Sequence, residues 1–167
     1  MGTAKEAIME AFLTRLEDEN FELLTVKDII EKAGCSRSTF YLRFEDKYNL
    51  LNTVRTLLNK RLLSFYQSKF SSAGGVTRHL CRHVLKYRSF YRMEFSDAEA
   101  VMNLSDSLAE MLVLTFRDED SAIFAGHGTI GYWHKWLKDG FVISPDEAAE
   151  KLLKVGLTDW TAAYERG

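Results

Sequence analysis

The chain has 167 residues, of which 46% are hydrophobic and 28% are charged, and its formal net charge at pH 7 is −2. This composition is typical of a globular protein and excludes an intrinsically disordered one. No apolar run approaches the roughly 20 residues of a membrane-spanning helix. A single proline and few alternating strand patterns predict an all-α fold.

The ends and the cysteines indicate the compartment. No basic stretch followed by an apolar one opens the sequence, so we expect no secretion signal. Cys35 and Cys81 lack CxxC spacing, which is typical of a reducing compartment rather than of a disulfide framework. We therefore expect a cytoplasmic protein without membrane contact.

Residues 3–19 predict an amphipathic first helix, because apolar side chains recur along one stripe. The stripe consists of Ala7, Ile8, Ala11, Phe12 and Leu16. Residues 20–24 are the expected connection to the next helix.

Residues 25–33 predict a short second helix with defined ends. Thr25 stands at the N-cap position, and Asp28 three residues later gives a weaker form of the usual capping box. Gly34 is expected to end this helix, because a left-handed conformation costs glycine little.

A third short helix is expected after this glycine turn, with Ser36 as its cap. Phe40 and Phe44 lie four residues apart, so both are expected to point inward. The outer faces then carry Arg37, Ser38, Thr39, Tyr41, Leu42 and Arg43. A short helix that presents polar and basic side chains, braced by another helix across a glycine turn, predicts a helix-turn-helix that reads a DNA major groove.

The segment AGCSRSTFYLRFEDKYNLL resembles the DNA-binding signature of the TetR family of transcriptional regulators. The matching positions are Thr25, Val26, Ile29, Ala33, Gly34, Ser36, Thr39, Phe40, Tyr41, Phe44, Lys47 and Leu50. This resemblance covers the first third of the chain. It implies a DNA-binding domain at residues 1–47 and a helical effector-binding and dimerisation domain at residues 48–167.

The resemblance also implies which side chains meet DNA. We expect base-edge contacts from Arg37, Ser38 and Thr39. The further positions expected in the DNA-binding surface, most of them near phosphates, are Thr25, Lys27, Ser36, Tyr41, Arg43 and Lys47.

The charge distribution limits how that surface works. Residues 1–47 hold ten acidic and seven basic residues, so the expected DNA-binding domain is not cationic as a whole. Residues 48–93 hold nine basic and no acidic residues, whereas residues 94–167 hold fourteen acidic and six basic ones. DNA binding would therefore depend on a local basic face, since phosphate contacts need only local positive charge.

The second half of the chain predicts further helices. Residues 47–70 predict one long helix, and residues 71–75, SSAGG, predict a flexible break. Residues 76–91 predict a basic and aromatic helix, in which His79 and His83 have the spacing of metal ligands. No third ligand is evident, so we expect no metal and a solvated basic face, with an anionic partner or effector as the alternative.

Residues 99–116 predict a helix that carries methionines and aliphatic residues. Such side chains fit either an ordinary core or the lining of the small-molecule cavity that TetR regulators usually hold in their second domain. The residues expected to line an effector pocket are Phe65, Tyr87, Phe90, Met102, Met111 and Phe116.

Residues 120–138 and 145–164 predict two closing helices, and this part resembles a TetR subgroup that includes activators of dihydroxyacetone-kinase operons. Gly126, Gly128 and Gly131 each cost about 1 kcal/mol inside a helix, so the close approach of another helix is expected to compensate. The resemblance implies a four-helix dimer interface, with a core inside one chain as the alternative. The expected interface residues are Phe124, Gly128, Gly131, Trp133, Trp136, Leu153, Leu157 and Trp160.

The resemblance to TetR regulators implies a dimeric repressor that binds a palindromic operator in double-stranded DNA and is released by a small-molecule effector, without a cofactor. A co-regulator controlled by a protein partner is the alternative. The sequence has no paired catalytic carboxylates, nucleophile with an oriented base or glycine-rich phosphate loop, so we expect no enzyme.

Overall fold

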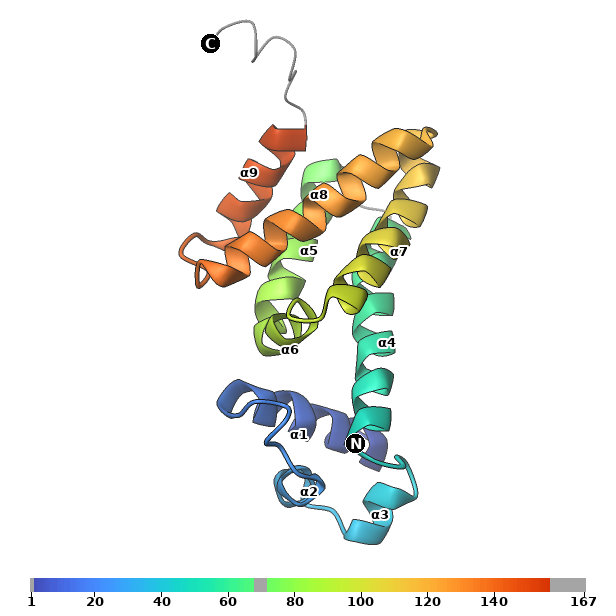
Figure 1. Ribbon diagram of the computed structural model, residues 1–167, viewed down its shortest axis with the longest axis vertical. Helices are drawn as coiled ribbons and strands as arrows, with labels where there is room; N and C mark the ends of the chain where they lie inside the picture. Colours follow the sequence, from blue (N-terminus) through green and yellow to red (C-terminus); the bar gives the residue numbers. More distant parts are fainter. Residues whose placement is uncertain (1, 68–71, 157–167) are drawn as a thin grey trace, which may run out of the picture. The chain divides into compact units, whose positions relative to one another are not determined.

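The computed structural model describes residues 2–67 and 72–156, and every regular element in these two ranges is a helix (Figure 1). The predicted all-α fold is thereby confirmed. The helices are α1 (Ala4–Asp18), α2 (Val26–Ala33), α3 (Arg37–Tyr41), α4 (Lys47–Gln67), α5 (Ala73–Lys86), α6 (Arg88–Glu94), α7 (Ala98–Phe116), α8 (Glu119–Lys138) and α9 (Pro145–Gly156). No helix of the described ranges is long and apolar enough to cross a membrane.

The chain divides into two compact units, Met1–Arg61 and Leu62–Gly167. The division falls inside α4, so this helix contributes to both units. The domain boundary expected after residue 47 stays a prediction.

The first unit consists of α1, α2, α3 and the beginning of α4. Its helix ends follow the sequence signals: Thr25 forms a capping box with Asp28, and Gly34 adopts the left-handed conformation with φ of 63°. A second capping box joins Thr3 and Glu6 at the start of α1. The core side chains of this unit are Ile8, Ala11, Phe12, Leu16, Phe21, Leu24, Ile29, Phe40, Phe44, Leu50, Leu51, Val54 and Leu58.

In the second unit α7 packs along α8, and α5 packs along α9 (Figure 1). A Cβ atom at Gly126 would lie 2.9 Å from the backbone nitrogen of Ala109, so the contact between α7 and α8 requires glycine at this position. This confirms for Gly126 that helix contact compensates the cost of glycine. At Gly128 and Gly131 no atom of the described residues lies within 4 Å of such a Cβ, so residues 2–67 and 72–156 supply no compensating contact there.

Two predicted boundaries are wrong. The expected break at 71–75 is replaced from residue 72 onward by the start of α5, because the Ser72 hydroxyl accepts the N–H of Gly75 and caps the helix. The helix expected at 76–91 is interrupted at Tyr87, whose ψ of 32° is not helical, so α5 ends and α6 begins there. The last part of the closing helix, residues 157–164, lies outside the described residues.

Gly126→Ala tests the contact between α7 and α8. We expect the free energy of unfolding to fall by about 1–3 kcal/mol, because the added methyl group overpacks a backbone contact. Urea unfolding followed by circular dichroism measures this loss. Lys138→Ala, at an exposed position of the same helix, should change it by less than about 0.5 kcal/mol, and equal effects in the two variants would contradict the packing.

Candidate nucleic-acid interface

The N-terminus of α3 presents a cluster of hydroxyl groups. The Ser36 Oγ accepts the backbone N–H of Thr39 at 3.1 Å and caps the helix. The hydroxyls of Ser38 and Thr39 each lie 2.8 Å from this same oxygen. Hydroxyl groups can donate and accept, so these three side chains can exchange their mutual hydrogen bonds for contacts to base edges or phosphates.

Arg37 and Tyr41 form a second feature of the same helix. The Arg37 guanidinium donates to the Tyr41 hydroxyl at 3.3 Å and lies 5.3 Å from the centre of its ring. The Tyr41 ring packs edge-on against Phe40, which is fully buried. The buried phenylalanine thus fixes the tyrosine, and the tyrosine orients an exposed guanidinium.

Leu42 also lies on the outer face of this region, and sequence reasoning did not assign it a role. Its side chain is 75% exposed. An exposed aliphatic group among hydroxyls can contact the C5 methyl group of thymine. The signal in the sequence was its position between Tyr41 and Arg43.

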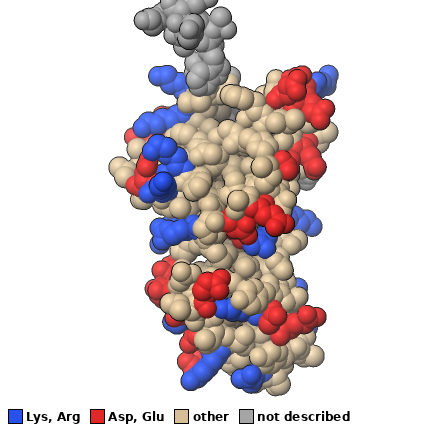
Figure 2. Space-filling view, in the orientation of Figure 1, with Lys and Arg blue, Asp and Glu red and all other residues tan. Residues whose placement is uncertain are grey.

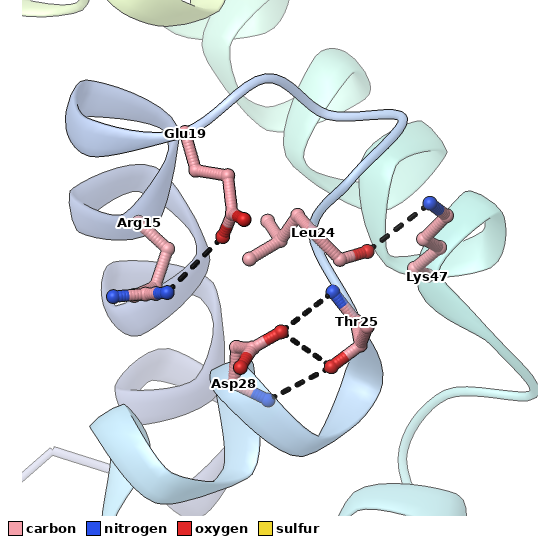
Figure 3. A network of polar contacts seen from close by, with 6 residues as sticks. All are labelled: Arg15, Glu19, Leu24, Thr25, Asp28 and Lys47. Atoms are coloured by element: carbon pink, nitrogen blue, oxygen red, sulfur yellow. Dashed lines mark hydrogen bonds and ion pairs between the residues drawn. The ribbon is translucent and has the colours of Figure 1, made fainter.

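The N-terminus of α2 is closed by its own capping box (Figure 3). The backbone N–H of Thr25 donates to the Asp28 carboxylate at 2.9 Å, and the Thr25 hydroxyl also donates to it. The backbone N–H of Asp28 in turn donates to the Thr25 hydroxyl at 3.3 Å. These hydrogen bonds from Thr25 lower the pKa of the Asp28 carboxyl.

The Lys47 side chain is held by the protein itself. Its ammonium nitrogen lies 3.0 Å from the carbonyl oxygens of Phe21 and Glu22 and 3.1 Å from that of Leu24. Figure 3 shows the side chain reaching from the start of α4 to the connection between α1 and α2. Because its ammonium group is already hydrogen-bonded within the protein, Lys47 differs from the exposed cations of the candidate interface.

Lys27, Arg37 and Arg43 are those exposed cations. Lys27 lies 3.9 Å from the Glu31 carboxylate across a solvent-exposed face of α2. Such a pair contributes little to stability and is easily exchanged. Figure 2 shows basic side chains at the tip of the first unit, where α2 and α3 lie.

The residues expected to line an effector pocket do not form one group. Met102 and Phe116 are 54% and 48% exposed, so both lie at the surface rather than in an enclosed cavity. Phe90 is buried in the core. Phe65 and Tyr87 both contact the His83 ring, at centroid distances of 5.9 and 4.8 Å.

Two surface hollows, of about 420 and 330 Å³, include none of these expected residues. The larger is lined by α4 residues between Asn49 and Lys60, and the smaller by residues of α6 and α8 with their following turns. Met111 is half-buried on α7. The effector pocket stays a prediction.

The two histidines with metal-ligand spacing have other partners. The His83 ring nitrogen is hydrogen-bonded to the buried Tyr91 hydroxyl at 3.0 Å, and that of His79 lies 2.9 Å from the Gly75 carbonyl oxygen. The described residues contain no group of three His, Cys, Asp or Glu side chains placed to hold a metal ion. Burial raises the pKa of the Cys81 thiol to about 11, so it is not a thiolate at neutral pH.

The basic face of α5 is partly neutralised by α9. Arg82 pairs with Asp146 at 3.0 Å, and Arg78 lies 4.0 Å from Glu150. These acidic residues belong to the same chain, so part of the positive charge that suggested an anionic partner is already matched.

The residues expected in a dimer interface fall into three groups. Trp133 and Trp136 are buried within the chain, so neither has surface to offer a second subunit, and the structure corrects both assignments. Phe124 is 68% exposed on α8, together with Gly128 and Gly131. The remaining positions are Leu153, which is half-buried, and Leu157 and Trp160, which lie outside the described residues.

Comparison with known proteins identifies relatives of the first unit. The family model described as "Bacterial regulatory proteins, tetR family" matches residues 5–54. The "Uncharacterized HTH-type transcriptional regulator YxbF" of Bacillus subtilis (strain 168) is 38% identical over 52 residues, which are 31% of this chain and 14% of that protein. The chain thus spans only a small part of the length of this relative.

Solved structures resemble this chain in fold over most of its length. A transcriptional regulator (TerR/AcrR family) from Aquifex aeolicus VF5 aligns with a TM-score of 0.72 at 14% identity, over 90% of this chain and 95% of that one. The dihydroxyacetone kinase operon activator DhaS aligns with a TM-score of 0.68 at 15% identity, over 92% and 94%. At these identities the likeness concerns the fold alone.

The α2 cap predicts a pH dependence. Since the pKa of Asp28 is lowered in the folded protein, its contribution to stability is present above the unfolded carboxyl pKa of about 3.9 and is lost as the pH falls through the lower, folded value. The difference in Tm between the wild type and Asp28→Asn should therefore be constant from pH 7 to 5 and shrink below about pH 4. Thermal unfolding across this range measures it, with Glu17→Gln on α1 as control, and a difference that grows in acid would contradict the assignment.

Proposed function

We propose that this chain, whose residues 5–54 match the model of the tetR family of bacterial regulatory proteins, is a transcriptional regulator that binds DNA as a dimeric repressor. It binds a palindromic operator and releases it when a small molecule binds the second unit. The observation that carries the proposal is the outward face of α3, where hydroxyls and an oriented guanidinium are exposed together on a capped helix.

The chemistry of this face suits major-groove readout. Arg37 can donate two hydrogen bonds to the O6 and N7 atoms of guanine, and Ser38 and Thr39 can donate or accept at neighbouring bases. Tyr41 and Arg43, at the end of α3, are assigned to phosphates, which position the helix without reading sequence. Lys27 adds exposed positive charge on α2, beside the α2 N-terminus capped by Thr25.

An exposed stripe of α8 supports the dimer. Phe124, Gly128 and Gly131 lie at spacings of four and three, so they share one helical face. The two glycines leave open space at this face, and a helix of a second subunit can approach closely there. Such contact would compensate the helix stability that the glycines cost.

In the proposed dimer, an effector would act through the spacing of the two α3 helices. In a dimer, the two α3 helices must enter successive major grooves about 34–36 Å apart. A small molecule that binds better to a dimer with a different spacing weakens DNA binding by the ratio of its two affinities.

Control by a protein partner is the second candidate, and one surface favours it. Leu114, Phe116 and Ile123 are 76%, 48% and 45% exposed around the turn between α7 and α8. Large apolar side chains exposed near one turn are a surface that a protein partner could cover. Retention of a partner protein on purification, without any small molecule that raises the Tm, would favour this reading.

Arg37→Ala tests the DNA-binding face. A gel-shift titration with the DNA upstream of the gene, against unrelated competitor DNA, should show specific binding by the wild type. The variant should lose about 1–3 kcal/mol of that binding, because a bidentate base contact is removed. Lys60→Ala, on α4, is the control, and an unchanged affinity of Arg37→Ala would contradict the assigned role.

Phe124→Glu tests the dimer. A carboxylate at the centre of the proposed α8 interface should shift the protein from dimer to monomer in sedimentation velocity at micromolar concentration, because a buried unpaired charge is costly. Met102→Glu, at an exposed position of α7, is the matched control. A wild type that sediments as a monomer would contradict the proposed dimer.

A further inference from the structure

The Lys47 ammonium is fully engaged in hydrogen bonds inside the first unit. A lysine ammonium has three N–H donors and no acceptor, and three carbonyl oxygens lie within 3.1 Å of this one. Its nitrogen also lies 4.7 Å from the centre of the Phe21 ring and 5.5 Å from that of Tyr48. At these distances both rings attract a cation.

Among the described residues, Lys47 is the donor that these three carbonyls share. In the described part of the chain, the N–H groups of Leu23 and Leu24 both bond to the Asn20 carbonyl, and no backbone N–H bonds to the carbonyls of Phe21, Glu22 or Leu24. Buried backbone carbonyls are nearly always hydrogen-bonded. The contacts of Lys47 with the carbonyls of Phe21 and Leu24 are half-buried, so Lys47 supplies a donor that the described backbone does not.

These contacts join distant parts of the sequence. The carbonyls lie 23 to 26 residues before Lys47, in the connection from α1 to α2. Leu24 directly precedes Thr25, the cap of α2. The first residue of α4 therefore fixes the point at which the helix-turn-helix begins.

We propose that Lys47 is a positioning residue for the DNA-binding surface, which acts by holding the α1–α2 connection and not by binding a phosphate with its side chain. This rests on the proposed DNA-binding function. To reach a phosphate, the ammonium would leave three charge-assisted hydrogen bonds and deprive the half-buried carbonyls of Phe21 and Leu24 of this donor. The compact ammonium suits three converging acceptors, whereas the planar fork of arginine does not.

Lys47→Met and Lys47→Arg separate the two roles. Lys27→Met is the matched control, since the Lys27 side chain is exposed and lies 3.9 Å from the Glu31 carboxylate. Affinities for an operator duplex and for a scrambled duplex of equal length are measured by fluorescence anisotropy over a salt series. The operator duplex is the one enriched by the wild type from random DNA.

We expect Lys47→Met to lose roughly tenfold or more in operator affinity, to change little on the scrambled duplex and to keep its salt slope. Lys47→Arg should show the same changes as Lys47→Met, although arginine keeps the positive charge. Lys27→Met should instead weaken both duplexes equally and reduce the slope by about one. If Lys47→Met does not fold, Lys47→Arg alone decides between the positioning role and the phosphate-binding role.

Two results would overturn the inference. One is an equal loss on both duplexes with a slope reduced by about one and restored by arginine, which is the behaviour of a phosphate ligand. The other is unchanged discrimination between the duplexes, which would leave Lys47 a purely structural role. Amide hydrogen exchange of residues 21–33 without DNA should be faster in both variants, and protection equal to that of the wild type would refute the contact itself.

A wild type that binds no duplex would refute the proposed function and, with it, the positioning role. The exchange measurement would then still decide whether Lys47 holds the connection. The failures of the two proposals are thus distinguishable.

Discussion

The proposed recognition helix, α3, is five residues long, and a helix of this length is not stable in water by itself. Its shape depends on the burial of Phe40 and Phe44 in the core of the first unit and on the Ser36 cap. The outward side chains of α3 can be polar and exposed because the inward ones supply the stability. Recognition and folding are therefore divided between two faces of one short segment.

The remaining contacts of the first unit set where this segment begins. The capping box of Thr25 and Asp28 closes the start of α2, and Lys47 holds the connection that precedes it. The left-handed Gly34 then allows the sharp turn into α3. In the second unit a single residue, Gly126, has a comparable effect, because the absence of a side chain lets α8 approach α7.

Local signals in the sequence predicted local structure well. The Thr25 cap, the glycine turn and the inward pair Phe40 and Phe44 are each decided by neighbours within four residues, and all three are present. The start of α5 was missed because a serine cap overrode the expectation for two glycines. Contacts between distant segments were also beyond prediction: the partners of Lys47 lie more than twenty residues away.

The apolar closing helices show a different limit of prediction from sequence. Periodicity identifies which residues avoid water but not whether their own chain or another copy covers them, and Trp133 and Trp136 proved to be covered by their own chain. Phe124, by contrast, is exposed on α8, and it is the residue on which the proposed dimer depends.

Selection of binding sites from random duplex DNA by the purified protein tests the central claim most directly. The account predicts an enriched palindrome whose half-sites are centred about 10–10.5 base pairs, or a multiple of this distance, apart. Enrichment of no sequence, or of a single unrepeated site, would contradict a dimeric regulator that reads DNA with two α3 helices.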